Sequence, residues 1–549
     1  MAFCGLWHER FSGNDFTMLF LRLSRSLDLL TDLAVPEVYS GLLWTGQGDE
    51  FPADKRVTCI GVSADGRVLT VRVGVGNPIP LFFGWDPDGC FVLSDSCAAA
   101  WKAIHGSESI GTEHLDRTAV VETLLFDGPL ASRTLLTNVK KFQMGELAFV
   151  DILNQTVEVQ WDWLPSIQSG SFSETDALEM AKKHILRLSE TFSDHSSALL
   201  PLTGGLDSRL LAGLARHEKK IELASYTFQR GPSLETWCAK KVAKNLNVSH
   251  ASVDLPAKAC YQKFAQHVVA KTAGMISGMH CHGIYSCERC ISDNMQSLPR
   301  VFGYFGDPVT GAMTDDESTR EQLDSPQSVL KKYEICIFPE LVQRYRTEII
   351  SDLRGSYEAF LASGSQPGTF HEFWKIQQRQ SNLITHLFSY HRSEHRVKVV
   401  LPFLDVQFID FFLSLPYGLR RNRALFKAAC KEIYPDLFKL PSMHFKPGSF
   451  LSCAEVVFEK LESGFNRMNP AQEWFLSPFK YEQHEKTLFS HLASDVQQGI
   501  DILCEMENVE KRAVQFPVWK HSTPKEYYRL AALKYLVDGP DPKSGDSDG

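Results

Sequence analysis

The chain has 549 residues and a net charge of −9, with 57 basic against 66 acidic side chains. This length exceeds what one hydrophobic core supports, so we expect two large domains or three. An ordinary composition with a mildly acidic balance argues against nucleic acid as the main ligand. We find no run of about 18 apolar residues and no secretory leader, and the 13 scattered cysteines indicate reduced thiols, so we expect a cytoplasmic protein without a membrane span.

The first 165 residues are rich in segments that resemble strands. Hairpins are predicted over residues 56–75, 79–96 and 145–161, each with a turn that contains Asp-Gly or Asn. One early helix is expected over residues 15–30. These elements predict a layered domain of antiparallel sheets.

The pattern changes after a linker rich in Ser, Pro and Gly at residues 164–177. An amphipathic helix follows, with Ser173 as its cap. Strands then alternate with helices, which predicts a parallel α/β sheet, and the pattern beyond about residue 320 is mostly helical. We therefore expect one domain over residues 1–165, a second over 172–540, and a disordered tail over 541–549.

The sequence Thr-Gly-Gly-Leu-Asp-Ser at residues 203–208 lies between a predicted strand and a predicted helix. Ligands of parallel sheets bind at the carboxyl ends of the strands, where this loop lies. Its glycines let the backbone approach a phosphate, and the first turn of the helix favours an anion. Asp207 would repel a phosphate directly, so it is suited to hold Mg²⁺ against one. The loop has no Walker lysine, and a structural glycine turn is the alternative interpretation.

This loop resembles the pyrophosphate-binding loop of ATP-pyrophosphatases, usually Ser-Gly-Gly-x-Asp-Ser, which split ATP into AMP and pyrophosphate. Thr203 takes the place of the first serine and keeps the hydroxyl. Further segments resemble asparagine synthetases in the same order along the chain; they are residues 77–104, 144–152, 225–250, 300–312, 399–420 and 440–450. Several spaced motifs in the same order indicate that the resemblance covers about residues 1–540.

The resemblance implies an α+β N-terminal sandwich of the nucleophile-hydrolase type. It also implies an α/β ATP-pyrophosphatase domain, like that of adenine nucleotide α-hydrolases, with a helical C-terminal part. ATP and Mg²⁺ would be the cofactors, with the metal on Asp207 and Asp307. Lys446 would stabilise negative charge on the pyrophosphate and the adenylate, and Lys427 matches a helix lysine near the active site. The residues implied to bind the nucleotide, with its adenine beside Tyr226 and Thr227, are Leu202, Thr203, Gly204, Gly205, Asp207, Ser208, Tyr226, Thr227 and Gly303.

The N-terminal part departs from the family. A glutaminase needs a cysteine at the mature N-terminus, but three residues precede Cys4, and the segments that hold glutamine are not found. Cys4 is better explained as a small buried residue, so we expect an inactive amidase domain. The arrangement then resembles β-lactam synthetases and lasso-peptide cyclases, in which the amine comes from elsewhere.

We therefore expect an ATP-dependent carbon–nitrogen ligase that adenylates a carboxylate and transfers it to an amine, in a specialised or peptide-cyclising form. The carboxylate would belong to an amino acid or a peptide, with a precursor peptide or a peptidase as a partner and with neither nucleic acid nor membrane as one. The first alternative is asparagine synthesis from ammonia or glutamine. The second is an inactive scaffold or binding protein.

The residue that accepts the proton of the amine is open. The glutamate that the family has four residues before Pro402 is replaced here by Lys398, and Glu394 is the nearest acid. Tyr304 lies three residues before Asp307, where β-lactam synthetases have a tyrosine that helps to deprotonate the amine. Its alternative role is that of an aromatic residue at a strand end.

Two other groups contain reactive side chains. The spacing of one is compatible with zinc, but a helix core stripe is the alternative, and a substrate-pocket role for its histidines is favoured over zinc; it consists of His280, Cys281, His282, Cys287 and Cys290. The other is a basic run that we interpret as a solvated helix face, Lys427 excepted; it consists of Arg420, Arg421, Arg423, Lys427 and Lys431.

Overall fold

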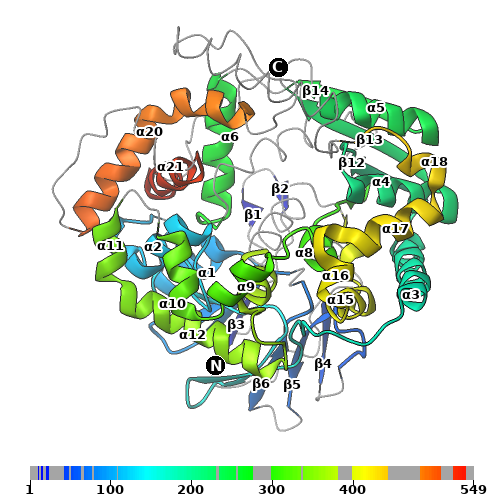
Figure 1. The fold of residues 1–549 in the computed structure, drawn as a ribbon. Helices are drawn as coiled ribbons and strands as arrows, with labels where there is room; N and C mark the ends of the chain where they lie inside the picture. Colours follow the sequence, from blue (N-terminus) through cyan, green and yellow to red (C-terminus); the bar gives the residue numbers. More distant parts are fainter. Residues whose placement is uncertain are drawn as a thin grey trace.

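The structure is a computed structural model (Figure 1), and it describes residues 10–11, 14–15, 20–23, 43–47, 51–63, 67–76, 79–107, 109–229, 234–254, 258–275, 298–334, 338–380, 398–442, 483–507 and 524–538. The predicted tail at residues 541–549 lies outside these ranges.

Two sheets form the N-terminal region, in the orders β11-β10-β6-β5-β4 and β3-β8-β7-β9, and a separate pair joins β1 to β2. Neighbouring strands are antiparallel except for β4 and β5, which are parallel. The strands are β1 (Arg10–Phe11), β2 (Asn14–Asp15), β3 (Phe20–Leu23), β4 (Leu43–Gln47), β5 (Thr58–Val62), β6 (Val68–Arg72), β7 (Phe82–Trp85), β8 (Phe91–Ser94), β9 (Lys140–Lys141), β10 (Glu146–Asp151) and β11 (Thr156–Trp161). The three predicted hairpins are β5–β6, β7–β8 and β10–β11, so they are confirmed.

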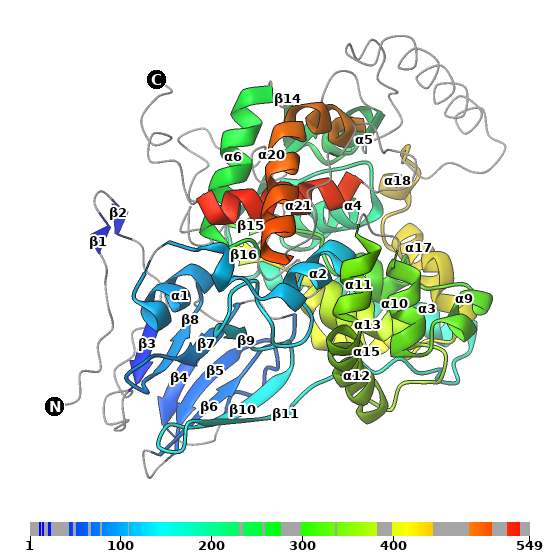
Figure 2. The ribbon, with the colours of Figure 1, turned by 90° about the vertical axis from the view of Figure 1, so that its left-hand side faces the viewer.

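The alternation of side chains along β7 shows how these layers are held. Phe83 faces the core between the two sheets, whereas Phe82 faces a second core that contains α1 (Cys97–His105) and α2 (Arg117–Phe126). The region is thus layered, with β7 and β8 between the other sheet and the two helices (Figure 2). Ser96 and Asp116 cap these helices, and η3 (Thr112–His114) lies between them.

The helix predicted over residues 15–30 is wrong at its centre. Residues 20–23 form β3, which pairs antiparallel with β8. Leu21 and Leu23 are buried on one face, while Arg22 between them pairs with Asp86 at 2.6 Å. This alternation has the period of a strand, and pairing with a strand far along the chain outweighs the local helical pattern.

The second region begins with a parallel sheet. Its strands are β12 (Ser197–Pro201), β13 (Glu222–Gln229), β14 (Ser249–Asp254), β15 (Arg300–Val301) and β16 (Val399–Val400). Its first helices are α3 (Glu174–Arg187), η4 (Leu188–Phe192), α4 (Leu206–Gly213), η5 (Leu214–Glu218), α5 (Leu234–Leu246) and α6 (Lys258–Lys271). Ser173 caps α3 as predicted, because its side chain accepts a hydrogen bond from the Asp176 amide.

The later part of the described chain is mainly helical, as predicted. Its helices are α8 (Gly306–Thr310), α9 (Glu317–Gln322), α10 (Pro326–Tyr333), α11 (Pro339–Arg344), α12 (Arg346–Ala362), α13 (Phe370–Trp374), η7 (Lys375–Gln380), η8 (Pro402–Leu404), α15 (Val406–Leu413), α16 (Tyr417–Arg420), η9 (Arg421–Arg423), α17 (Ala424–Ile433), α18 (Pro435–Phe438), α20 (Gln483–Glu507) and α21 (Pro524–Asp538). In the described ranges, none of the helices is long and apolar enough to span a membrane.

The parallel sheet has the order β14-β13-β12-β15-β16, and all of its neighbours are parallel. This confirms the predicted α/β sheet. The chain starts at the centre with β12, moves outward to β14, and returns to the other side of β12 for β15 and β16. The strand order therefore reverses between β12 and β15, and such a switch point is where open α/β sheets bind ligands.

The two regions share one hydrophobic core. Trp101 of α1 and Leu200 of β12 belong to the same cluster of buried side chains. Ionic contacts join the regions as well, since Arg133 donates to Asp352 of α12 at 2.6 Å. The predicted domain boundaries at residues 165 and 172 stay predictions, because this core continues across them.

Candidate active site

The candidate site lies at the switch point of the parallel sheet. The loop at residues 203–208 follows β12, and the segment from Gly303 to Asp307 follows β15. These two strands are neighbours in the sheet, with Leu199 paired to Arg300. The two predicted metal-binding aspartates thus come from adjacent strand ends, as the sequence motifs imply.

Hydroxyl groups hold the 203–208 loop in shape. The Thr203 and Ser208 side-chain oxygens lie 2.9 Å apart, the Thr203 amide donates to the Ser208 hydroxyl at 3.1 Å, and the Gly205 amide donates to the Thr203 hydroxyl at 3.1 Å. Gly205 is the N-cap of α4 and makes no side-chain cap. The first amides of α4 therefore face this loop with the positive end of the helix dipole, which favours an anion.

The carboxylates of Asp207 and Asp307 converge on one guanidinium, that of Arg423. Its Nη1 donates to Asp207 Oδ2 at 3.0 Å and to Asp307 Oδ1 at 2.5 Å, and its Nη2 pairs with Asp207 Oδ1. Glycines make room for this contact, because a side chain at position 306 would come within 2.9 Å of Asp207 Oδ1. Burial raises the pKa of Asp207 to about 6, although Arg423 opposes the rise.

The interpretation of the basic run as a solvated helix face is wrong for Arg420 and Arg423. Both are buried, at 1% and 5% exposure, whereas Arg421 is exposed. Arg420 forms a bidentate pair with Glu372 of α13, with contacts of 2.6 and 3.0 Å. The side chains split in this way because Asn422 and Arg423 have the positive φ angles of 55° and 61°, which turn the chain sharply between α16 and α17.

Arg209 is a site residue that sequence reasoning missed. It is 1% exposed, and its guanidinium donates to the Gly204 carbonyl at 3.4 Å, to Leu440 at 3.0 Å and to Pro441 at 2.5 Å. It therefore ties the 203–208 loop to the segment after α18. The available signal was an arginine directly after the Thr-Gly-Gly-Leu-Asp-Ser motif. This signal is ambiguous, because an exposed cation beside a phosphate loop and a buried one look alike in sequence.

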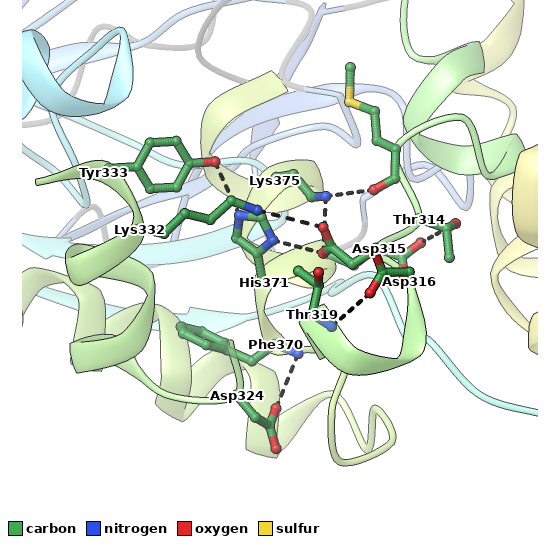
Figure 3. A network of polar contacts seen from close by, with 12 residues as sticks. Thr314, Asp315, Asp316, Thr319, Asp324, Lys332, Tyr333, Phe370, His371 and Lys375 are labelled. Carbon is green, nitrogen blue, oxygen red and sulfur yellow. Dashed lines mark hydrogen bonds and ion pairs between the residues drawn. The ribbon is translucent and has the colours of Figure 1, made fainter. Parts of the chain in front are cut away.

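A second polar network lies next to the site, in the loop after α8 (Figure 3). His371 of α13 contacts Asp315 through Nδ1 at 2.7 Å, and its Nε2 lies 3.1 Å from the Tyr333 hydroxyl. Lys375 donates to Asp315 at 3.2 Å and to the Met313 carbonyl at 2.5 Å. A neutral His371 that donates from Nδ1 and accepts at Nε2 satisfies every partner. The network ties the loop that follows Asp307 to α13.

Helix α13 contacts both the loop after α8 and the turn before α17, which carry residues of the site. His371 and its neighbour Glu372 are buried on α13, one bonded to Asp315 and the other to Arg420. Thr314 also donates to Glu372 at 3.0 Å. Gly311 ends α8 at a φ of 99°, and a side chain there would lie 2.1 Å from the Arg420 carbonyl. Helix α13 therefore fixes the distance between α8, which carries Asp307, and the turn that carries Arg423.

The predicted adenine-binding side chains are buried at the end of β13. Tyr226 is 1% exposed and packs with Leu199, and its carbonyl accepts from the Leu202 amide at 2.8 Å. Thr227 donates its hydroxyl to the Leu202 carbonyl and lies 3.3 Å from His250 Nε2. These residues border the switch point through their backbone, and a contact between their side chains and adenine stays a prediction.

The predicted catalytic residues are placed unequally. Tyr304 is 38% exposed at the end of β15, between Gly303 and Asp307, and partial burial raises its pKa. Lys427 lies on α17 one turn after Arg423, and burial together with the charges of Arg423 and Lys431 lowers its pKa. Lys398 precedes β16, and its charge acts on His195, which precedes β12. Lys398 therefore lies at the amino edge of the sheet, opposite the 203–208 loop.

Several predictions lie outside the described residues. These are Lys446, Glu394, Cys4 and the zinc candidate at residues 280–290. Across the described part of the chain, no group of three or more His, Cys, Asp or Glu side chains is placed to hold a metal. Asp207 and Asp307 are a pair, and this number fits Mg²⁺, which takes one or two carboxylates and completes its shell with phosphate and water.

Comparison with known proteins supports the motif argument. Residues 193–293 match the family model for asparagine synthase. No curated protein matches the chain. The matched segment contains β12, the 203–208 loop with Asp207, and the next strands and helices of the sheet. Over residues 193–293, which include one side of the candidate site, the chain is similar to the asparagine synthase family.

Proposed function

We propose that the protein is an ATP-dependent carbon–nitrogen ligase that adenylates a substrate carboxylate and transfers the acyl group to an amine. The asparagine synthase match supports ATP-dependent amide-bond formation in general. The observation that carries the specific proposal is the convergence of Asp207 and Asp307 on one guanidinium at the switch point of the sheet. Two carboxylates that need a cation, beside a helix N-terminus that favours an anion, suit a nucleoside triphosphate with Mg²⁺.

In this mechanism, an oxygen of the substrate carboxylate attacks the α-phosphorus of ATP, and the bond to pyrophosphate breaks. The amine then attacks the acyl carbon, AMP leaves, and a base takes the amine proton. Mg²⁺ held by Asp207 and Asp307 would neutralise charge on the leaving pyrophosphate. The hydroxyls of Thr203 and Ser208 and the first amides of α4 would bind phosphate oxygens, and Lys446 would add positive charge.

The base stays a choice between two residues. Tyr304 is partly exposed and lies three residues before Asp307, which supports a role toward an amine that approaches the adenylate. Glu394 is the alternative from sequence. Lys398, at the position of the usual glutamate, lies on the opposite edge of the sheet and does not serve. Both residues therefore stay candidates: the raised pKa of Tyr304 favours a neutral phenol, which could take the amine proton only while it passes its own proton to a partner base, whereas an ionised Glu394 could take it directly.

The finer proposal is that the amine comes from the substrate itself, as in a peptide-cyclising enzyme of the lasso type, with a precursor peptide as partner. It rests on the predicted loss of glutaminase chemistry, with Cys4 preceded by three residues. The N-terminal layered region would then be a retained nucleophile-hydrolase-like scaffold. Asparagine synthesis and a catalytically inactive scaffold are the alternatives.

An ATP–pyrophosphate exchange assay tests the proposal. We expect exchange of labelled pyrophosphate into ATP when the correct carboxylate is present. Three sets of substrates are compared: aspartate with ammonium, aspartate with glutamine, and peptides with a free side-chain carboxylate. They distinguish ammonia-dependent asparagine synthesis, glutamine-dependent asparagine synthesis and peptide cyclisation. Glutamate release from glutamine that disappears in Cys4→Ala would show that the amidase domain is active. A lack of nucleotide binding in calorimetry would favour the inactive scaffold.

A further inference from the structure

Arg423 has a more specific place in the site than a general positive charge. Its Nη1 is shared by Asp207 and Asp307, and its Nη2 pairs with the second oxygen of Asp207. The guanidinium is 5% exposed and lies over the Phe426 ring, 4.5 Å from the centroid. Its donors therefore cover lone pairs of both carboxylates that a metal ion would use.

We propose that Arg423 acts as an internal counter-cation that holds Asp207 and Asp307 together before ligands bind and that leaves the carboxylates only when Mg²⁺ and nucleotide arrive together. This inference rests on the proposed function, because it assumes that these carboxylates receive the metal. It adds an order to that function: the metal alone binds weakly, and nucleotide makes it bind tightly.

The coupling follows from what Arg423 loses when the metal displaces it. A buried guanidinium without an anion is strongly unfavourable. Mg²⁺ alone would take both carboxylates from Arg423 and offer it nothing in return. Nucleotide phosphates bring negative charge to the same strand ends, so a displaced guanidinium has a new partner. Metal and nucleotide then favour each other's binding by the same factor, as linkage requires.

The backbone around Arg423 restricts this exchange to its side chain. Asn422 and Arg423 hold left-handed conformations, which persist only where surrounding structure fixes them. The bidentate pair of Arg420 with Glu372, which is buried on both sides, anchors the turn three residues earlier. The Cα of Arg423 is thereby fixed near the two aspartates, and the guanidinium is the part that can exchange partners.

Mn²⁺ is a suitable probe, because the free ion is measured directly by electron paramagnetic resonance. Full-length protein is titrated with Mn²⁺ alone and with a non-hydrolysable ATP analogue, and the Mn²⁺ that the analogue binds in solution is subtracted by a titration of the analogue without protein. We expect the wild type to bind Mn²⁺ at least about tenfold tighter with the analogue. In Arg423→Met, Mn²⁺ binding without nucleotide should become about tenfold tighter or more, because no cation has to be displaced, and the enhancement by the analogue should shrink.

Arg421→Met is the matched control. Arg421 lies in the same turn but is exposed, 5.7 Å from the Tyr417 ring, so its variant should bind Mn²⁺ like the wild type. The double variant Asp207→Asn with Arg423→Met should lose the gained affinity, which shows that the gain belongs to this site. Arg423→Lys preserves the charge but not the fork, so it should give an intermediate gain and serves if Arg423→Met does not fold.

Equal Mn²⁺ affinity in wild type and Arg423→Met without nucleotide would overturn the proposal. So would a wild type that binds Mn²⁺ equally well with and without the analogue while calorimetry shows that the analogue binds. Failure of the proposed function has a different signature, which is no binding of the analogue to the wild type. The comparison without nucleotide still decides the role of Arg423 in that case.

Discussion

Two arginines three residues apart show how differently this protein uses buried charge. Arg420 and Glu372 are each 1% exposed and form a bidentate pair of one cation with one anion. Arg423 instead shares its guanidinium between two carboxylates, and one of them, Asp307, is 53% exposed. The balanced pair of Arg420 and Glu372 has no net charge. The unbalanced cluster of Arg423 and its two carboxylates has surplus negative charge at an open strand end. We infer that the first holds the fold and the second receives a ligand.

The strongest test of this difference concerns the unbalanced cluster. Asp207→Asn and Asp307→Asn should each lower the rate of ATP–pyrophosphate exchange by several orders of magnitude, because the charge that holds the metal on pyrophosphate costs several kcal/mol to lose. The free energy of unfolding, from urea titration, should change by less than about 1 kcal/mol, since the change removes surplus charge. Asp436→Asn, at an 87% exposed carboxylate, is the control. Near-normal exchange in either variant would contradict the metal assignment.

The balanced pair should behave in the opposite way. Glu372→Gln leaves Arg420 buried beside a neutral amide and should lower the free energy of unfolding by about 3–5 kcal/mol. Changing Arg420 to Met in addition should recover part of this loss, because the unpaired buried cation is removed. Urea unfolding of the single and double variants measures the coupling. A cost below about 1 kcal/mol for Glu372→Gln would show that the pair is not structural in the way its burial suggests.

The sequence identified one half of the unbalanced cluster and missed the other. The loop containing Asp207 and the segment containing Asp307 follow recognisable strand ends, so a contiguous motif placed them. Arg423 is 216 residues from Asp207 and 116 from Asp307. Its neighbours Arg420 and Arg421 form a charged run that predicts a solvated face. The two positive φ angles that separate these side chains are not visible in composition or periodicity.

The fold was predictable to a similar degree. Hairpins with Asp-Gly turns and the alternation of strands and helices gave both kinds of sheet. The order of the strands, which creates the switch point, depends on contacts between β12 and β15, about 100 residues apart, and no local pattern contains it. The helix expected at residues 15–30 failed for the same reason, because β3 exists through its pairing with β8.

The polar network of His371 and Asp315 tests the difference between balanced and unbalanced buried charge through the pH dependence of stability. Burial lowers the pKa of His371 to about 4, although Asp315 opposes this, and hydrogen bonds lower the pKa of Asp315 to about 2 despite its burial. A lowered histidine pKa means that the unfolded chain binds the proton first, so stability falls as pH drops from about 6.5 to 4. The Asp315 contribution is lost in turn between about pH 4 and 2.

His371→Gln should therefore be less stable than the wild type at pH 7 but should lose less stability on acidification. Between pH 7 and pH 5 we expect the wild type to lose about 2 kcal/mol more than the variant. Urea unfolding at both values measures this, with His217→Gln on η5 as a control outside the network. Parallel pH dependences in wild type and His371→Gln would exclude His371 as the titrating group.

A third buried carboxylate decides whether surplus charge alone marks a functional site. Glu122 of α2 is 0% exposed and lies beside Asp352, and Arg133 is shared between Asp352 and Asp116 at 2.6 and 3.0 Å. This resembles the Arg423 cluster, but it lies away from the switch point. Burial first and Asp352 second raise the pKa of Glu122 well above its ordinary value, so the folded protein keeps the protonated form where the unfolded chain ionises, and stability falls as pH rises above about 4.5. Glu122→Gln imitates that form, because its amide oxygen can accept from the Leu130 amide, 2.9 Å from the present carboxylate, while its NH₂ donates to Asp352. For Glu122→Gln we expect the free energy of unfolding to rise by about 1 kcal/mol at pH 8 and to be nearly unchanged at pH 4, and we expect normal ATP–pyrophosphate exchange. Glu113→Gln, at a 71% exposed side chain, is the control and should change neither quantity. A fall in exchange for Glu122→Gln would mean that surplus buried charge serves the reaction even where no strand end opens beside it.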